Sequence, residues 1–216
     1  MKGLLVKDFR QIMKQRKFLL LILILAICLN LNGDGSFVFG YLTFVGGFLV
    51  LNTISYDEYD NTLPFLFTLP VERRSYVIEK YVFGILVCVV GWLAGLVVTL
   101  VQSLFLPDMP LQEILMSAPV FVPIFMLMLS VMIPFPLIFG REKGTIVMMV
   151  VMGAFIALSY WLDRILTERG IYISQFLDSL SGMTLGMVLL IAFAVAFIVL
   201  SISCVACLTA MRKKEF

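Results

Sequence analysis

The sequence predicts an all-α membrane protein, and three observations support that prediction. Of the 216 residues, 62% are hydrophobic and only 14% are charged, whereas about a quarter of residues are charged in soluble domains. The mean hydropathy is +1.07. Six apolar runs have the composition of helices that cross the ~30 Å hydrocarbon layer, and they cover residues 18–31, 37–54, 81–106, 114–140, 145–162 and 183–211. We therefore expect a single transmembrane domain over residues 1–216.

A basic amphipathic helix is expected before the first run. Drawn as a helix, residues 1–17 place apolar side chains on one face (Leu5, Phe9, Ile12, Met13) and basic ones on the other (Lys2, Lys7, Arg10, Lys14). Such a helix lies in the membrane interface, and it is predicted to form an elbow into the first span. The run itself would make only about 21 Å of helix. We therefore expect that span to begin earlier, near Ile12, or to lie in a thinned bilayer.

The connection between the second and third runs is unusually charged, because residues 55–80 hold eight of the chain's thirty charged side chains. Asn61 or Thr62 is suited to cap a helix that begins at Pro64. Pro70 is suited to start a second helix, which is expected to continue through "VERRSYVIEKYV" into the third run. The prediction is a helix, a break and another helix.

The third and fourth runs contain glycine and proline patterns. Gly91 and Gly95 form a GxxxG pair, which allows close helix approach either within the chain or in a dimer. Four prolines predict a kinked or broken helix in the fourth run, and this break would serve either as a hinge or as a plain bend: Pro119, Pro123, Pro134 and Pro136.

A short amphipathic helix is expected between the fifth and sixth runs. Its apolar positions follow the i, i+3, i+4, i+7 spacing of one helix face, and they are Ile173, Phe176, Leu177 and Leu180. We predict that this helix lies on the outer side of the membrane.

The basic residues predict the orientation, because cytoplasmic connections carry an excess of Lys and Arg. Of the sixteen basic residues, only Arg164 and Arg169 fall in the connections assigned to the outer side. The other fourteen fall at the two termini, in residues 55–80 and in the turn after the fourth run. Both termini are therefore predicted to be cytoplasmic.

Several function classes are disfavoured by residues that the chain lacks. It has no histidine, which removes HExxH zinc sites, Ser-His-Asp triads and histidine proton relays. It has no GxxxxGK[ST] motif for ATP and no nucleic-acid-binding motif. No Asp, Glu, Lys or Arg lies inside the six runs, which disfavours an ion-coupled carrier. We expect the chain to be no enzyme and to bind no cofactor, metal or nucleic acid.

The chain resembles the ABC-2 type permeases, the six-span membrane subunits of bacterial ABC exporters. The resemblance rests on "LLVKDFRQIMKQRKF", "DEYDNTLPFLFTLPVERRSYVIEKY", "PFPLIFGREKG" and the helical outer excursion before the last run. Thr145 stands where a basic residue is expected. The resemblance implies a cytoplasmic-membrane exporter in which two permease copies, as a homodimer, pair with two ATPase subunits that carry ATP and Mg.

The resemblance also implies that residues 57–74 form a coupling helix that docks into the ATPase. The segment offers apolar anchors within a charged rim: Leu63, Phe65, Leu66, Phe67 and Leu69, with Asp57, Glu58, Asp60, Arg73 and Arg74. The alternative is a solvated loop that dips into the interface. Arg141, Glu142 and Lys143 would make a second ATPase contact or act as a positive-inside anchor.

In such a family the translocation path runs along the second and fifth spans. The second run offers candidates to line it, which are Phe37, Phe39, Tyr41, Phe44, Phe48 and Asn52. A mostly apolar path suits an amphipathic or hydrophobic cargo such as a peptide, although packing against lipid explains the same aromatics equally well. The alternative function is a stand-alone membrane immunity or binding protein that works without ATP.

Overall fold

The computed structural model describes residues 2–30, 37–59, 72–105, 111–140 and 185–213, together with a few positions between 143 and 164. Its described elements are helices: α1 (Lys2–Lys14), α2 (Arg16–Asn30), α3 (Phe37–Tyr59), α5 (Arg73–Ser103), α6 (Leu111–Ser117), η1 (Ala118–Val120), α7 (Phe121–Met132), α8 (Pro134–Phe139) and α11 (Leu185–Lys213). The predicted all-α fold class is confirmed for this part of the chain.

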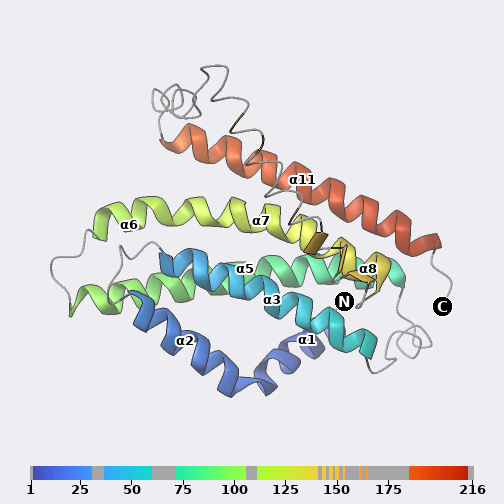
Figure 1. Cartoon of the computed structure of the whole chain (residues 1–216), viewed down its shortest axis with the longest axis horizontal. Helices are drawn as coiled ribbons and strands as arrows, with labels where there is room; N and C mark the ends of the chain where they lie inside the picture. Colours follow the sequence, from blue (N-terminus) through green and yellow to red (C-terminus); the bar gives the residue numbers. More distant parts are fainter. Residues whose placement is uncertain are drawn as a thin grey trace.

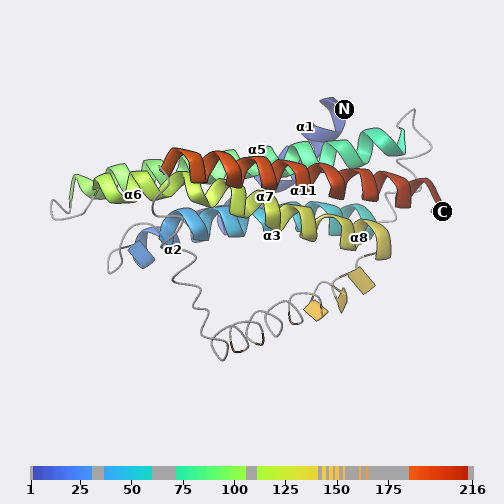
Figure 2. The same cartoon turned by 90° about the horizontal axis from the view of Figure 1, so that it is seen from above.

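The long helices lie side by side along one axis (Figures 1 and 2). The helix α3 packs along α5, and α7 packs against both of them and against α11. Four helical stretches are long and apolar enough to cross a membrane, namely Phe37–Asp57, Arg73–Ser103, Leu111–Phe139 and Gly186–Met211. The chain is therefore a multi-pass membrane protein, as predicted.

Two of the six predicted spans are not established by these helices. The first predicted run corresponds to α2, which has 15 residues and is about 22 Å long at 1.5 Å per residue, shorter than the ~30 Å hydrocarbon layer. Only six residues of the predicted span over residues 145–162 are described, and the predicted outer helix around Ile173–Leu180 lies outside the described residues.

The helix that contains the first run begins at Arg16 and does not extend back to Ile12, the start that one of the two sequence alternatives gave. The chain turns at Gln15, so that α1 and α2 form a V in Figure 1. The backbone N–H of Gln15 donates to Ile12 O at 2.9 Å, and those of Phe18 and Leu19 both donate to Gln15 O at 3.0 Å. These bonds close one helix and start the next, so α2 begins at Arg16.

Two helices extend beyond the apolar runs that predicted them. The second run ends at residue 54, whereas α3 continues to Tyr59. The third run begins at residue 81, whereas α5 already begins at Arg73, which confirms a helix that continues from the charged connection into this span. This helix does not start at Pro70, where the sequence predicted its start, because the backbone of Glu72 is extended. Both extensions carry charged residues whose side chains find partners on neighbouring helices, as described below.

The prolines break the fourth predicted span, as expected. A 3₁₀ turn at Ala118–Val120 contains Pro119 and separates α6 from α7, and a turn at Ile133 separates α7 from α8 just before Pro134. The backbone of Gly140 then adopts a φ of 82°, which favours glycine, and its N–H donates to Pro136 O at 2.9 Å. This bond ends α8.

Glycines hold α3 and α5 close together at mid-length. A Cβ added to Gly91 would lie 3.1 Å from the carbonyl oxygen of Leu42, and one added to Gly95 would lie 2.9 Å from the ring of Phe39. The GxxxG pair therefore serves packing within the chain. Toward the other end of these helices, a larger apolar cluster joins α3, α5, α7 and α11, with Val50, Ile54, Val77, Leu129 and Cys207 among its members.

Candidate functional site

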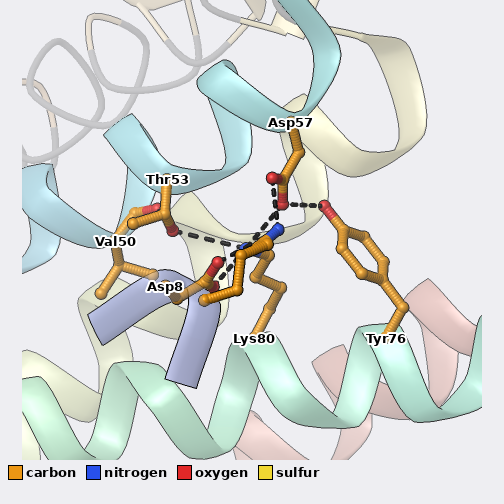
Figure 3. Close-up of polar contacts among 7 residues, drawn as sticks. Asp8, Val50, Thr53, Asp57, Tyr76 and Lys80 are labelled. Carbon is orange, nitrogen blue, oxygen red and sulfur yellow. Dashed lines mark hydrogen bonds and ion pairs between the residues drawn. The ribbon is translucent and has the colours of Figure 1, made fainter. Parts of the chain in front are cut away.

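Charged and polar side chains from three helices meet where α3 ends and α5 begins, a region that we call the charged end (Figure 3). They form one group, the ion cluster, which consists of Lys7 and Asp8 of α1, Thr53 and Asp57 of α3, and Tyr76, Glu79 and Lys80 of α5. This group is the most distinctive polar arrangement in the described part of the chain.

Helix periodicity brings these residues together. Thr53 and Asp57 are four residues apart on α3, and Tyr76 and Lys80 are four residues apart on α5, so each pair shares one helix face. On α1, Asp8 follows the buried Leu4 by the same spacing. Polar positions on one face of each of the three helices therefore meet.

Lys80 lies at the centre of the ion cluster. Its Nζ donates to Asp8 Oδ2, lies 2.9 Å from Asp57 Oδ2 and lies 3.5 Å from the Thr53 hydroxyl oxygen. The same ammonium group sits 5.2 Å from the centre of the Tyr76 ring, within cation–π range. One lysine of α5 thus binds carboxylates of both α1 and α3.

Asp57 is the second centre, because its carboxylate receives donors from two other helices. Its Oδ1 accepts a hydrogen bond from Lys7 Nζ, and its Oδ2 accepts one from the Tyr76 hydroxyl at 3.0 Å. Lys7 also lies 3.2 Å from Asp8 Oδ1. The two lysines and two aspartates therefore form a closed ring of ion pairs across α1, α3 and α5.

The ring is almost completely withdrawn from solvent. Asp8 and Lys80 are 0% exposed and Asp57 is 4% exposed, whereas the Lys7 side chain keeps 31% exposure. Removing one member of a buried ion pair leaves its partner desolvated, which costs about 3–5 kcal/mol. The ring therefore holds α1 on α3 and α5 only while its buried members, Asp8, Asp57 and Lys80, are present.

Glu79 is the least satisfied member of the ion cluster. It is 1% exposed, and neither of its carboxylate oxygens accepts a hydrogen bond from a described donor, although the Asp8 carboxyl lies close to it. Three carboxyl groups, those of Asp8, Asp57 and Glu79, face only two ammonium groups. The cluster therefore has a formal charge of −1 when all five groups are ionised.

The position of the ion cluster matters as much as its chemistry. Asp57 lies near the end of α3 and Lys80 near the beginning of α5, so the cluster joins the two helices that flank residues 60–71. Arg73 adds a fourth helix, because its Nη1 donates to Met211 O of α11 at 3.3 Å. Any force applied to residues 60–71 would reach four helices through these contacts.

The structure places only some of the predicted ATPase-contact residues. Asp57 is buried in the ring, Arg73 is half-buried and Arg74 is exposed. Glu58 belongs to α3, but its side chain lies outside the described part, as do Asp60 and residues 61–71, which include Leu63, Phe65, Leu66, Phe67 and Leu69. Arg141 and Glu142 also lie outside it, and Lys143 is exposed.

The predicted path residues divide into two groups on α3. Phe39 is buried, and its ring stacks on that of Phe121 at 6.3 Å, so it belongs to the core. Phe37, Phe44 and Phe48 are exposed, and the rings of Phe44 and Phe48 meet edge to face at 5.0 Å. Tyr41 and Asn52 are half-buried on the side of α3 that faces α2.

Sequence reasoning missed most of the ion cluster. The apolar runs themselves contain no charged residue, but α3 and α5 continue past the ends of the runs and bury Asp57, Glu79 and Lys80. The described helices therefore do bury ionisable groups, contrary to the expectation from the apolar runs. The polar pairs 53/57 and 76/80, each with helical spacing, are the signal that would have found the cluster.

The comparisons with known proteins give one match. A family model described as "ABC-2 family transporter protein" matches residues 3–212, nearly the whole chain. No curated protein and no solved structure gives a comparable match. The matched range contains every member of the ion cluster and all but the last residue of the long helices.

Proposed function

This chain belongs to the ABC-2 transporter family, and we propose that it is the permease subunit of an ATP-driven exporter in a bacterial cytoplasmic membrane. Members of this family are membrane components of transporters. The four helices that are long and apolar enough to cross a membrane fit such a role. In this proposal a separate ATPase subunit, present in two copies, binds ATP and Mg, and this chain converts the motion of that subunit into transport. Both termini face the cytoplasm.

The ion cluster is the single observation that carries the proposal of coupling. It connects α1, α3 and α5 by buried ion pairs at the two helix ends that flank residues 60–71. A segment that docks on a moving ATPase needs a rigid connection to the spanning helices, because a loose connection would absorb the motion. Buried ion pairs supply such a connection, since separating them leaves desolvated charges.

We assign different roles to the two parts of the proposed coupling segment. Residues 58–74, with the apolar anchors Leu63–Leu69 and the exposed Arg74, would contact the ATPase, and Arg141–Lys143 would form a second contact. Asp57 is bound to Lys7, Lys80 and Tyr76, so its proposed role is to anchor the segment to α1 and α5 rather than to touch the partner.

The proposed assembly contains a second copy of the permease, and the two copies enclose a path beside α3. The exposed Phe37, Phe44 and Phe48 would give this path an apolar wall, which suits an amphipathic or hydrophobic cargo such as a peptide. Phe39 is excluded from the wall because it is buried against Phe121.

The test uses the full chain, tagged and purified together with bound proteins. We expect it to recover an ATPase subunit and to stimulate ATP hydrolysis in proteoliposomes. The variant Phe67→Asp should abolish both effects, because it would bury an unpaired charge in the docking groove. The variant Arg74→Ala is the matched control at the rim and should change them little. Recovery of no ATPase would overturn the proposal and favour the stand-alone membrane immunity or binding protein.

A second candidate is an ion-coupled carrier, and Glu79 is the observation that favours it. Buried ionisable groups within spanning helices often carry protons, and Glu79 is 1% exposed and accepts no hydrogen bond from a described donor. If the exporter proposal is right, transport should persist when ATP is supplied and the proton gradient is collapsed. Loss of transport under that condition, with a parallel loss in Glu79→Gln, would establish the carrier instead.

A further inference from the structure

The V formed by α1 and α2 leaves an open recess lined with basic residues. The recess has a volume of about 710 Å³, and it lies where the chain turns at Gln15. Its lining consists of Lys14, Gln15, Arg16, Lys17, Phe18, Asn52 and Tyr56. Among these described residues three are cations and none is an acid, so the recess attracts anions.

An apolar groove continues from this recess between α2 and α3. It has a volume of about 480 Å³, and Phe18 and Asn52 line both hollows. Its other lining residues are mainly aliphatic and aromatic, and they include Leu21, Leu25, Tyr41, Val45 and Phe48. The hydrogen bond from Asn52 Nδ2 to Gln15 Oε1, at 3.4 Å, marks the border between the polar and the apolar hollow.

The dimensions of the groove suit one leaflet of a bilayer. Between Tyr41 and Asn52 the helix α3 rises by about 16 Å at 1.5 Å per residue, which is close to half of the ~30 Å hydrocarbon layer. Leu21 and Phe48 remain about half exposed on its walls. An acyl chain of one leaflet would cover these side chains, and its headgroup would then lie beside the cations.

From this arrangement we propose that the recess and the groove together bind one anionic phospholipid. Its phosphate would lie against Lys14, Arg16 and Lys17, because basic pockets beside spanning helices recognise anionic headgroups. The Asn52 amide and the Tyr56 hydroxyl supply neutral donors beside these cations. One acyl chain would fill the groove between α2 and α3, so that the lipid holds α2 against the rest of the bundle.

This binding site does not depend on ATP coupling, and it shares only Phe48 with the proposed wall of the cargo path. The exposed Phe44 and Phe37 do not line the groove, so a path along them and a lipid beside α2 are compatible. The lipid has a structural consequence of its own, because α2 contacts the other long helices mainly through α3. Occupancy of the groove should therefore raise the thermal stability of the protein.

The test measures the thermal stability of the delipidated full chain in neutral detergent with three probes. They are dioleoyl phosphatidylglycerol, dioleoyl phosphatidylcholine and the chain-free headgroup glycerophosphoglycerol. We expect only the first to stabilise the protein at micromolar concentration. Equal stabilisation by phosphatidylcholine would show groove filling without headgroup recognition, and equal stabilisation by the chain-free headgroup would show a plain phosphate site. Either result overturns the proposal, and so does no stabilisation by any probe.

A variant pair locates the site. Arg16→Gln/Lys17→Gln removes two cations from the recess and should weaken the phosphatidylglycerol response by at least about tenfold in concentration. Arg74→Gln/Lys143→Gln removes two exposed cations elsewhere and should change it by less than about twofold. An equal loss in both variants would mean that general surface charge attracts the lipid, and the proposal would be wrong. The ranking of the three probes on the parent chain stands even if a variant folds poorly.

Discussion

The helices α3 and α5 are held together in two different ways along their length. At mid-length, the glycine seam brings Gly91 against the Leu42 backbone and Gly95 against the Phe39 ring. At the charged end, Asp57 and Lys80 meet with ion partners from α1. The same two helices thus have one neutral contact and one that depends on buried charge.

The difference shows which contact between α3 and α5 depends on close packing alone and which depends on charge. Close packing at the glycine seam is short-range and leaves no space for movement without lost contacts. The ion cluster instead depends on α1, on the charge state of five ionisable groups and on whatever binds residues 60–71. The glycine seam should therefore be insensitive to changes of charge, whereas the charged end should weaken when a buried member of the ion cluster is neutralised.

The largest predicted effect comes from removing the central cation of the ion cluster. Lys80→Met keeps most of the side-chain volume but leaves Asp8 and Asp57 without their shared partner, which should lower the unfolding free energy by about 3–5 kcal/mol. Reversible unfolding in mixed micelles measures this loss. The double variant Lys80→Met/Asp8→Asn should lose less than the sum of the single variants. A loss in Lys80→Met below about 1 kcal/mol would show that the ring does not hold the helices together.

A smaller loss is expected from overfilling the glycine seam. The Cβ of Gly95→Val would lie 2.9 Å from the buried Phe39 ring, so the ring or the helices must shift, at a cost of about 1–3 kcal/mol. The matched control is Gly186→Val on α11, where a Cβ has nothing within 4 Å. Thermal unfolding of both variants distinguishes lost packing from a general effect of valine in a helix. Equal stability of the two variants would contradict the role of the seam.

The glycine seam was easier to predict from the sequence than the ion cluster, for a physical reason. A GxxxG pair and a proline-rich run each affect the helix in which they lie. The local sequence was therefore enough to predict close approach at the glycines and a broken helix at the prolines. The ion cluster joins residues up to 72 positions apart. Asp8 is buried, although it belongs to a helix whose charged residues were expected to face solvent. Hydropathy also ended the second run before Asp57 and began the third run after Lys80, because it scores a paired charge as it scores a free one.

The smallest predicted effect separates the rim of the ion cluster from its centre. Lys7 touches both Asp8 and Asp57, but its side chain keeps 31% exposure, so water and salt screen its charge. Lys7→Gln should therefore lower the unfolding free energy by about 1 kcal/mol or less. This loss should shrink as the salt concentration rises from about 0.05 to 0.5 M, because the Debye length falls well below 10 Å over that range. The Lys80→Met loss should keep its size over the same range, because Lys80 is 0% exposed. Unfolding of both variants at the two salt concentrations makes the comparison. Equal salt dependence would mean that the cluster is one solvated group, and the charged end would then have no buried centre to distinguish it from an ordinary surface ion-pair network.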